Sequence, residues 1–227
     1  MAATSLMTTV LLLCCVAVYG QKPCCSPDKW TAHLLQKTGA YDTDTGASKR
    51  DVSSRINYDY TLKKMSMFTE TRNTTYNTST FLQTIIDYNK GMEWRISGTD
   101  CTRHVTTEKM LPPCFLEGAE FFGYHKMAEM PVEVWFRDDG KGHSSRFTMA
   151  RDPCVLVTET TRSIMPGYGS YELSFGIYEN VTTGYVDPGV FSIPSICPRS
   201  GPVIKKYPKQ TPMWPWYVPS TYFSPDP

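Results

Sequence analysis

The chain has 227 residues, with 23 Lys or Arg against 22 Asp or Glu, so its formal net charge is +1. This balance argues against a nucleic-acid-binding protein, which would need clustered basic residues on one face, and we expect no nucleic-acid partner. A hydrophobic fraction of 41% and an aromatic fraction of 13% exclude an acidic disordered chain and are sufficient for one packed domain.

The first element is an apolar run at residues 10–18, which is too short to span a membrane. Gly20 follows Val18 and Tyr19 and supplies the small residue that signal peptidase requires. We therefore expect residues 1–20 to be a cleaved signal peptide and the mature protein to be secreted or luminal. No later stretch reaches the roughly 18 apolar residues of a transmembrane helix, so we expect no transmembrane segment.

Cleavage at this point leaves six cysteines in the mature chain. An even number in an oxidising compartment predicts three disulfides. No Cys-x-x-Cys motif occurs, which argues against a zinc site. Adjacent cysteines rarely pair with each other, so each of the first two is expected to join a distant segment. The six are Cys24, Cys25, Cys101, Cys114, Cys154 and Cys197.

Three Asn-x-Ser/Thr motifs agree with the same compartment. They begin at Asn73, Asn77 and Asn180. Each is a weak signal alone, but beside a leader and paired cysteines they predict a glycoprotein with glycans at three surface points.

From residue 52 onward the apolar residues alternate with polar ones, which is the period of a β-strand. We expect strands over residues 52–60, 64–68, 80–88, 91–97, 102–108, 132–137, 144–150, 155–161 and 170–178. Tight turns are expected at residues 89–91 and 138–142, where glycine permits a positive φ. This spacing predicts an all-β, mainly antiparallel fold, either a sandwich or an open barrel.

Two segments interrupt this pattern. Residues 111–130 contain Pro112 and Pro113 and are expected as a short helix, a segment over a cavity mouth, or a loop packed on the sheet edge. Their apolar cluster consists of Phe115, Leu116, Phe121 and Phe122. Residues 198–227 hold eight of the seventeen prolines and several aromatic residues. Proline excludes central strands there, so we expect an extended tail that either is disordered or packs on the domain, a partner or a ligand.

The sequence offers no set of catalytic residues, and we expect no enzymatic activity. The four histidines form no metal-binding motif, and Ser170 lacks the following glycine of a nucleophile elbow. The turn from Tyr41 to Gly46 begins like a calcium-binding loop, but its twelfth position is Ser53 where a Glu is required. A surface turn is the better interpretation, no cofactor is required, and no metal ligand can be assigned.

The alternating apolar residues define one face of a sheet, which either packs solidly or lines a cavity for an apolar ligand. Strand parity alone selects the expected pocket residues. They are Phe81, Ile85, Met92, Trp94, Val134, Phe136, Phe147, Phe175 and Ile177.

Several motifs resemble the ependymin-related proteins, which are secreted animal glycoproteins. They include Pro23-Cys24 before Trp30, Tyr88-Asn89-Lys90-Gly91-Met92, Asp100-Cys101, Arg151-Asp152-Pro153-Cys154 and Gly176-Ile177-Tyr178. The most specific block runs from Asp187-Pro188-Gly189 to Ile196-Cys197. The resemblance covers the mature chain to about Pro198, and implies an ependymin-like domain over residues 21–197 followed by the tail at 198–227.

This resemblance implies two stacked curved sheets with one or two short helices, enclosing a hydrophobic pocket, similar to bacterial lipoprotein-carrier folds. It also implies non-catalytic binding of lipids or other apolar molecules, homodimers, association with Ca²⁺, and an extracellular or lysosomal location. The family pattern implies disulfides Cys24–Cys154 and Cys101–Cys197. A further pair common in the family is absent here, so Cys25 and Cys114 are expected to pair instead.

The leading hypothesis is therefore a secreted, disulfide-linked β-protein that binds a hydrophobic small molecule or lipid between its sheets. The alternative is an extracellular matrix, cell-adhesion or signalling glycoprotein that acts through its surface and associates with calcium.

Overall fold

The computed structural model describes residues 21–165, 169–197 and 204–205. Regular structure in this part is almost entirely β-strand, so the predicted all-β, mainly antiparallel class is confirmed. The strands are β1 (Lys29–Asp42), β2 (Gly46–Asp59), β3 (Lys64–Asn73), β4 (Thr78–Asp87), β5 (Met92–Ser97), β6 (Asp100–Val105), β7 (Glu120–Met127), β8 (Met130–Asp138), β9 (His143–Arg151), β10 (Cys154–Met165), β11 (Ser170–Thr183) and β12 (Ile204–Lys205).

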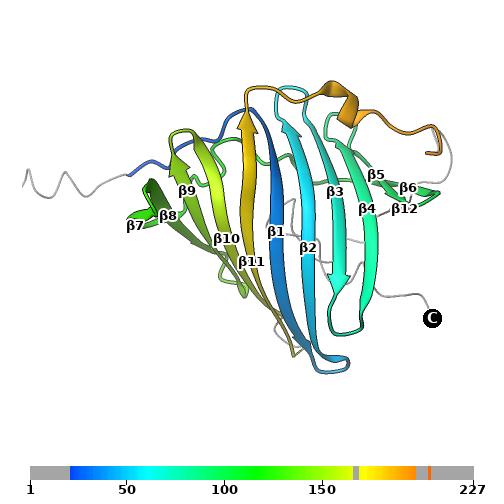
Figure 1. Cartoon of the computed structure of the whole chain (residues 1–227), viewed down its shortest axis with the longest axis horizontal. Coiled ribbons are helices and arrows are strands. Elements are labelled where there is room, and N and C mark those ends of the chain that lie inside the picture. Colours follow the sequence, from blue (N-terminus) through cyan, green and yellow to red (C-terminus); the bar gives the residue numbers. More distant parts are fainter. Residues whose placement is uncertain (1–20, 166–168, 198–203, 206–227) are drawn as a thin grey trace, which may run out of the picture.

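These strands form one continuous sheet instead of two separately hydrogen-bonded ones. The order is β12-β6-β5-β4-β3-β2-β1-β11-β10-β9-β8-β7, and every pair is antiparallel except β12 with β6. The two halves are joined because β1 pairs along its length with both β2 and β11. Twist accumulates across so many strands, so the sheet bends around a concave face, as Figure 1 shows.

Both predicted turns are confirmed. Residues 88–91 connect β4 to β5, and Gly91 has a φ of 60°. The turn between β8 and β9 contains Gly140 and Gly142 with φ of 66° and 97°. Glycine reaches this left-handed region without a steric cost, which is why the turn residues could be read from the sequence.

The main hydrophobic core lies on the concave face of the sheet. The strands contribute alternate residues, and residues 21–28 and 106–119 lie against them. The buried members are Ala32, Leu34, Ile56, Tyr58, Met65, Met67, Ile86, Met110, Phe115, Leu116, Trp135, Phe147, Met149 and Tyr178. Because successive side chains of a strand point to opposite faces, this cluster establishes which residues of each strand face inward.

A smaller cluster lies on the outer, convex face of β4 and β5. It consists of Ile85, Trp94, Ile96 and Cys197, with Met92 and Cys101 packed against it. The segment after β11, orange in Figure 1, passes the ends of the long strands to reach this cluster. It contains the 3-10 helix η1 (Pro188–Phe191), which the Asp187 carboxylate caps by accepting a hydrogen bond from the Gly189 amide at 2.8 Å.

Residues 111–130 match one of the expected arrangements, a segment that covers the concave face, and also contain a strand that was not expected. The part up to residue 119 covers the concave face and buries Phe115 and Leu116, whereas Glu120–Met127 forms the edge strand β7. None of the described segments forms a helix long and apolar enough to cross a membrane. The expected signal peptide at 1–20 and the tail at 198–227 lie outside the described residues, apart from β12.

Candidate ligand-binding site

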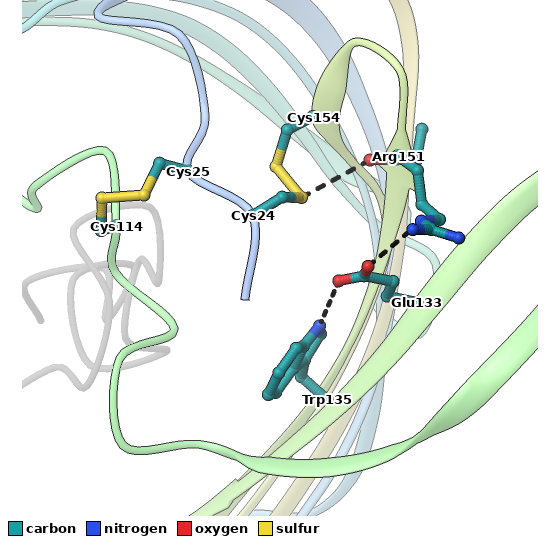
Figure 2. Close-up of a disulfide and its surroundings, with 8 residues drawn as sticks. Cys24, Cys25, Cys114, Glu133, Trp135, Arg151 and Cys154 are labelled. Atoms are coloured by element: carbon teal, nitrogen blue, oxygen red, sulfur yellow. Dashed lines mark hydrogen bonds and ion pairs between the residues drawn. A yellow bond between two sulfur atoms is a disulfide. The ribbon is translucent and has the colours of Figure 1, made fainter. Parts of the chain in front are cut away.

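Three disulfides connect the irregular segments to the sheet. Cys24 joins Cys154 at the start of β10, Cys25 joins Cys114, and Cys101 joins Cys197. The first and third are the pairs implied by the family resemblance, and the second is the pair expected of the two remaining cysteines. Figure 2 shows that the adjacent Cys24 and Cys25 point to different partners, one toward β10 and the other toward the segment that covers the concave face. The N-terminal segment is therefore held on two sides.

An opening with about 420 Å³ of space not filled by protein atoms, part of it solvent, lies between this covered region and the sheet. We call it the apolar pocket. Its described lining carries no charged side chain. The lining residues are Ser26, Trp30, Ala32, Tyr58, Leu111, Pro112, Pro113, Phe115, Val155, Leu156, Tyr178 and Val181.

Aromatic rings form the sheet side of the apolar pocket. Trp30 of β1 and Tyr58 of β2 are cross-strand partners, and their rings stack with centroids 5.2 Å apart. The Tyr58 hydroxyl donates a hydrogen bond of 2.7 Å to the Leu111 carbonyl oxygen, which ties the covering segment to the sheet. Burial raises the pKa of Tyr58, so this hydroxyl stays a donor at physiological pH.

The opposite wall is held by short-range contacts around Cys25–Cys114. The Ser26 amide donates to the Pro113 carbonyl oxygen at 2.9 Å, and the Phe115 ring packs edge-on against Phe147 with centroids 5.9 Å apart. Arg137 of β8 donates to the Phe115 carbonyl oxygen at 2.8 Å. The wall is therefore attached to β2 in the middle of the sheet and to β8 and β9 near one edge.

Near Cys24–Cys154, a buried carboxylate connects the next strands (Figure 2). Glu133 of β8 accepts a hydrogen bond from Trp135 Nε1 at 3.2 Å and pairs with Arg151 Nε at 3.3 Å. The Trp135 side chain is buried in the core below. These contacts fix β8 and β9 beside the disulfide that anchors the N-terminal segment.

A second opening, about 500 Å³ including open solvent, continues along the concave face toward the β1–β2 turn. We call it the polar groove. Its lining mixes apolar side chains with hydroxyls, an amide and one buried ion pair. The lining residues are Leu34, Gln36, Thr38, Arg50, Val52, Ser54, Ile56, Met67, Thr69, Thr71 and Glu172.

The ion pair joins β2 and β11, the two strands that flank β1. Arg50 Nη2 lies 2.7 Å from Glu172 Oε2, and both side chains are only 9% exposed. Ser54 Oγ and Thr69 Oγ1, which line the same groove, form a hydrogen bond of 2.8 Å. A buried charge is tolerated when it is paired and hydrogen-bonded, so Arg50 and Glu172 stabilise each other in place.

The carboxyl group of Glu159 is buried next to the apolar pocket. Glu159 of β10 is 8% exposed, and its Oε2 accepts a hydrogen bond of 3.0 Å from the hydroxyl of Tyr178, which lines the apolar pocket. Burial disfavours the carboxylate and raises the pKa of Glu159 to about 7, although the hydrogen bond from Tyr178 acts in the opposite direction. Glu159 is therefore partly neutral near physiological pH.

Replacing Glu159 with glutamine is expected to remove a pH dependence of stability. Below pH 4.5, the ordinary pKa of a glutamate, Glu159 is neutral in both the folded and the unfolded protein. As the pH rises toward 7, Glu159 loses its proton in the unfolded chain before it does so in the folded protein. The free energy of unfolding therefore falls over this interval, by about 3 kcal/mol at pH 8, and E159Q should avoid this loss. Urea unfolding from pH 4 to pH 8 measures it, with the exposed Glu179→Gln as control. Parallel profiles for wild type and E159Q would contradict the assignment.

The nine pocket residues predicted from strand parity require correction. Phe147 is inward-facing and fully buried, but it belongs to the packed core. The other eight lie on the outer face, and the described linings of the two openings contain none of the nine. Ile85, Met92 and Trp94 belong to the outer cluster, and Val134 and Phe136 flank the inward Trp135. The remaining three, Phe81, Phe175 and Ile177, are exposed.

The error has one physical cause, which is clearest in β11. Its outward residues Tyr171, Leu173, Phe175 and Ile177 are exposed and apolar, whereas the inward Glu172, Ser174 and Gly176 are polar or small. A one-residue shift in parity moves every side chain to the other face. Gly176 indicates which face is inward, because no larger side chain fits there. A Cβ at this position would lie 2.8 Å from Leu34 Cδ1 on the concave face.

The other predicted site residues lie where a surface modification or turn would be found. Asn77 and Asn180 are exposed, and Asn73 is half-buried at the end of β3.

In the β1–β2 turn, Asp42 Oδ1 accepts hydrogen bonds from the Asp44 and Thr45 amides, which lowers the pKa of Asp42. No group of three or more His, Cys, Asp or Glu suited to a metal ion occurs among the described residues. Glycosylation and calcium association stay predictions.

No protein-family model matches the sequence, and no curated protein matches it. Several solved structures align with part of the chain. An uncharacterized conserved protein from Thermus thermophilus aligns with a TM-score of 0.47 and 7% identity, over 79% of this chain and 91% of that one. A chain of the Pseudomonas aeruginosa MucA/MucB complex aligns with a TM-score of 0.33 and 10% identity, over 74% of this chain and 57% of that one. A LolA superfamily protein from Nitrosomonas europaea aligns with a TM-score of 0.30 and 6% identity, over 74% of this chain and 91% of that one.

Proposed function

We propose that this chain is a secreted, non-catalytic member of the ependymin-related proteins that binds a hydrophobic small molecule or lipid on the concave face of its sheet. One observation carries the proposal: an uncharged pocket, walled by the Trp30–Tyr58 stack and by residues 111–115, opens from the core. The leader pattern and the three disulfides support an extracellular or lysosomal location.

The hydrophobic effect supplies the affinity in this proposal. Burial of a methylene group contributes about 0.8 kcal/mol, so an eight-carbon segment would gain roughly 6 kcal/mol before the entropy of association is subtracted. The stacked rings of Trp30 and Tyr58 offer a flat apolar surface, and the hydrogen bond from Tyr58 to Leu111 already satisfies the polar atom beside it. An apolar ligand therefore leaves the Tyr58 hydroxyl with its partner.

Trp30→Ala is expected to weaken binding of the apolar fluorophore N-phenyl-1-naphthylamine by about tenfold, because it removes one of the two stacked rings. Phe68→Ala is the matched control, since Phe68 of β3 is an exposed aromatic residue that lines neither opening. Fluorescence titration of folded protein measures both. The proposed function would be contradicted by a wild-type protein that does not bind the probe, or by equal losses in the two variants.

A second candidate function rests on the outer face of β11. Its exposed apolar residues Leu173, Phe175 and Ile177, with Leu35 of β1 beside Ile177, could contact a protein surface. This arrangement favours the alternative of a matrix, adhesion or signalling glycoprotein, and a homodimer could form through the same face. Native mass spectrometry of the secreted protein separates the two: retained lipid supports ligand binding, and a ligand-free dimer supports surface recognition.

A further inference from the structure

The concave face changes character along its strands. At one end the cross-strand neighbours are Trp30, Tyr58 and Met65, which are aromatic or apolar. Farther along β1 and β2 the inward neighbours are Thr38 and Arg50, with Ser174 of β11 beside Thr38. The buried hydroxyl side chains of the inward face near this end are Thr38, Ser54, Thr69, Thr71, Ser145, Ser163 and Ser174. The face is therefore amphipathic lengthwise, with an apolar end and a hydroxyl-rich end.

The two openings lie next to each other along this gradient. Ala32 and Tyr58 line the apolar pocket, and the next inward residues of the same strands, Leu34 and Ile56, line the polar groove. Consecutive inward residues of a strand are about 7 Å apart. One elongated molecule could therefore contact both openings, with its two ends in different surroundings.

Charge in the lining restricts which molecule that could be. Arg50 is the one cation in the described linings, and Glu172 neutralises it at 2.7 Å. At the pocket end, Lys29 is likewise paired with the buried Asp59 at 3.3 Å. An anionic head group buried here would have to compete with Glu172 for Arg50 or remain without a counter-charge, and both are costly.

An uncharged polar group meets better partners. Each Ser or Thr hydroxyl is both a donor and an acceptor, and a hydroxyl that already makes one hydrogen bond, such as Ser54 with Thr69, retains capacity for another. Gln36 adds an amide on the same face, within 3.4 Å of Thr38 Oγ1. Hydroxyl and amide groups of a ligand can therefore be satisfied without disturbing the Arg50–Glu172 pair.

We propose that the ligand is an uncharged amphiphile whose polar part carries hydroxyl or amide groups, with its hydrocarbon in the apolar pocket and its polar part in the polar groove. This inference rests on the proposed function and specifies its ligand class. It predicts discrimination between two molecules that share a hydrocarbon chain and differ in head-group charge.

Monoolein and oleate provide that comparison at pH 8, where oleate is ionised. We expect monoolein to displace N-phenyl-1-naphthylamine with an affinity at least tenfold higher than that of oleate, each below its aggregation concentration. Equal affinities, or tighter oleate, would overturn the neutral-ligand inference and leave the proposed function intact. If the probe itself does not bind, both the inference and the proposed function fail.

Glu172→Gln supplies the complementary test, because it leaves Arg50 without its counter-charge. The ratio of oleate affinity to monoolein affinity should rise at least fivefold. An unpaired buried cation can destabilise the fold, so the double variant Arg50→Gln with Glu172→Gln is measured in parallel. Oleate should remain weak in that neutral variant. An equal gain in oleate affinity in both variants would contradict the role of the ion pair.

Discussion

Replacing Cys25 and Cys114 together with alanine is expected to lower the free energy of unfolding by about 4 kcal/mol. The bridge spans 89 residues, but Cys24–Cys154 already connects the same N-terminal segment to β10. The shortest loop that the Cys25–Cys114 bridge closes therefore runs through the roughly 40 residues between Cys114 and Cys154, and loop-closure entropy gives the stated loss. Urea unfolding under non-reducing conditions measures it.

The same variant should also weaken binding of the apolar fluorophore. Pro112, Pro113 and Phe115 form one wall of the apolar pocket, and Cys114 lies between them. Without the disulfide, the Tyr58–Leu111 and Ser26–Pro113 hydrogen bonds would have to hold this wall. Ordering a loosened wall on binding subtracts from affinity.

The double variant Cys101→Ala with Cys197→Ala is the matched control. This disulfide belongs to the cluster on the outer face, away from both openings. It should reduce stability by a comparable amount and leave probe affinity unchanged. Equal loss of probe affinity in the two variants would show that general destabilisation, and not the pocket wall, governs binding.

Strand positions could be predicted well wherever alternation was uninterrupted. The expected strands at 80–88 and 144–150 correspond to Thr78–Asp87 and His143–Arg151. The first long strand, β1, was missed because its inward residues change from Leu34 to Gln36 and Thr38, so that the apolar alternation stops halfway. The strand β7 was missed because a bulge between Phe121 and Gly123 places two aromatic residues in succession.

The candidate site was harder to predict, for a related reason. A packed core gives a regular apolar pattern, whereas a face that also lines a groove carries polar residues such as Arg50 and Glu172. These two are 122 residues apart, and no local pattern connects them. The apolar pocket depends equally on residues 111–115, whose place over the sheet follows from the disulfide to Cys25. Alternation gives the period of a strand but not the side that faces inward.

Phe147→Ala and Phe175→Ala test that assignment of faces directly, because the two substitutions are chemically identical. Phe147 is 0% exposed and packs against Phe115, so its truncation should leave a cavity and cost about 4 kcal/mol of unfolding free energy. Phe175 is 45% exposed on the outer face, and its truncation should cost less than about 1 kcal/mol. Urea unfolding of both variants at one pH gives the comparison. Similar losses at the two positions would mean that the outer face of β11 is buried against another surface, and the described arrangement of this strand would need revision.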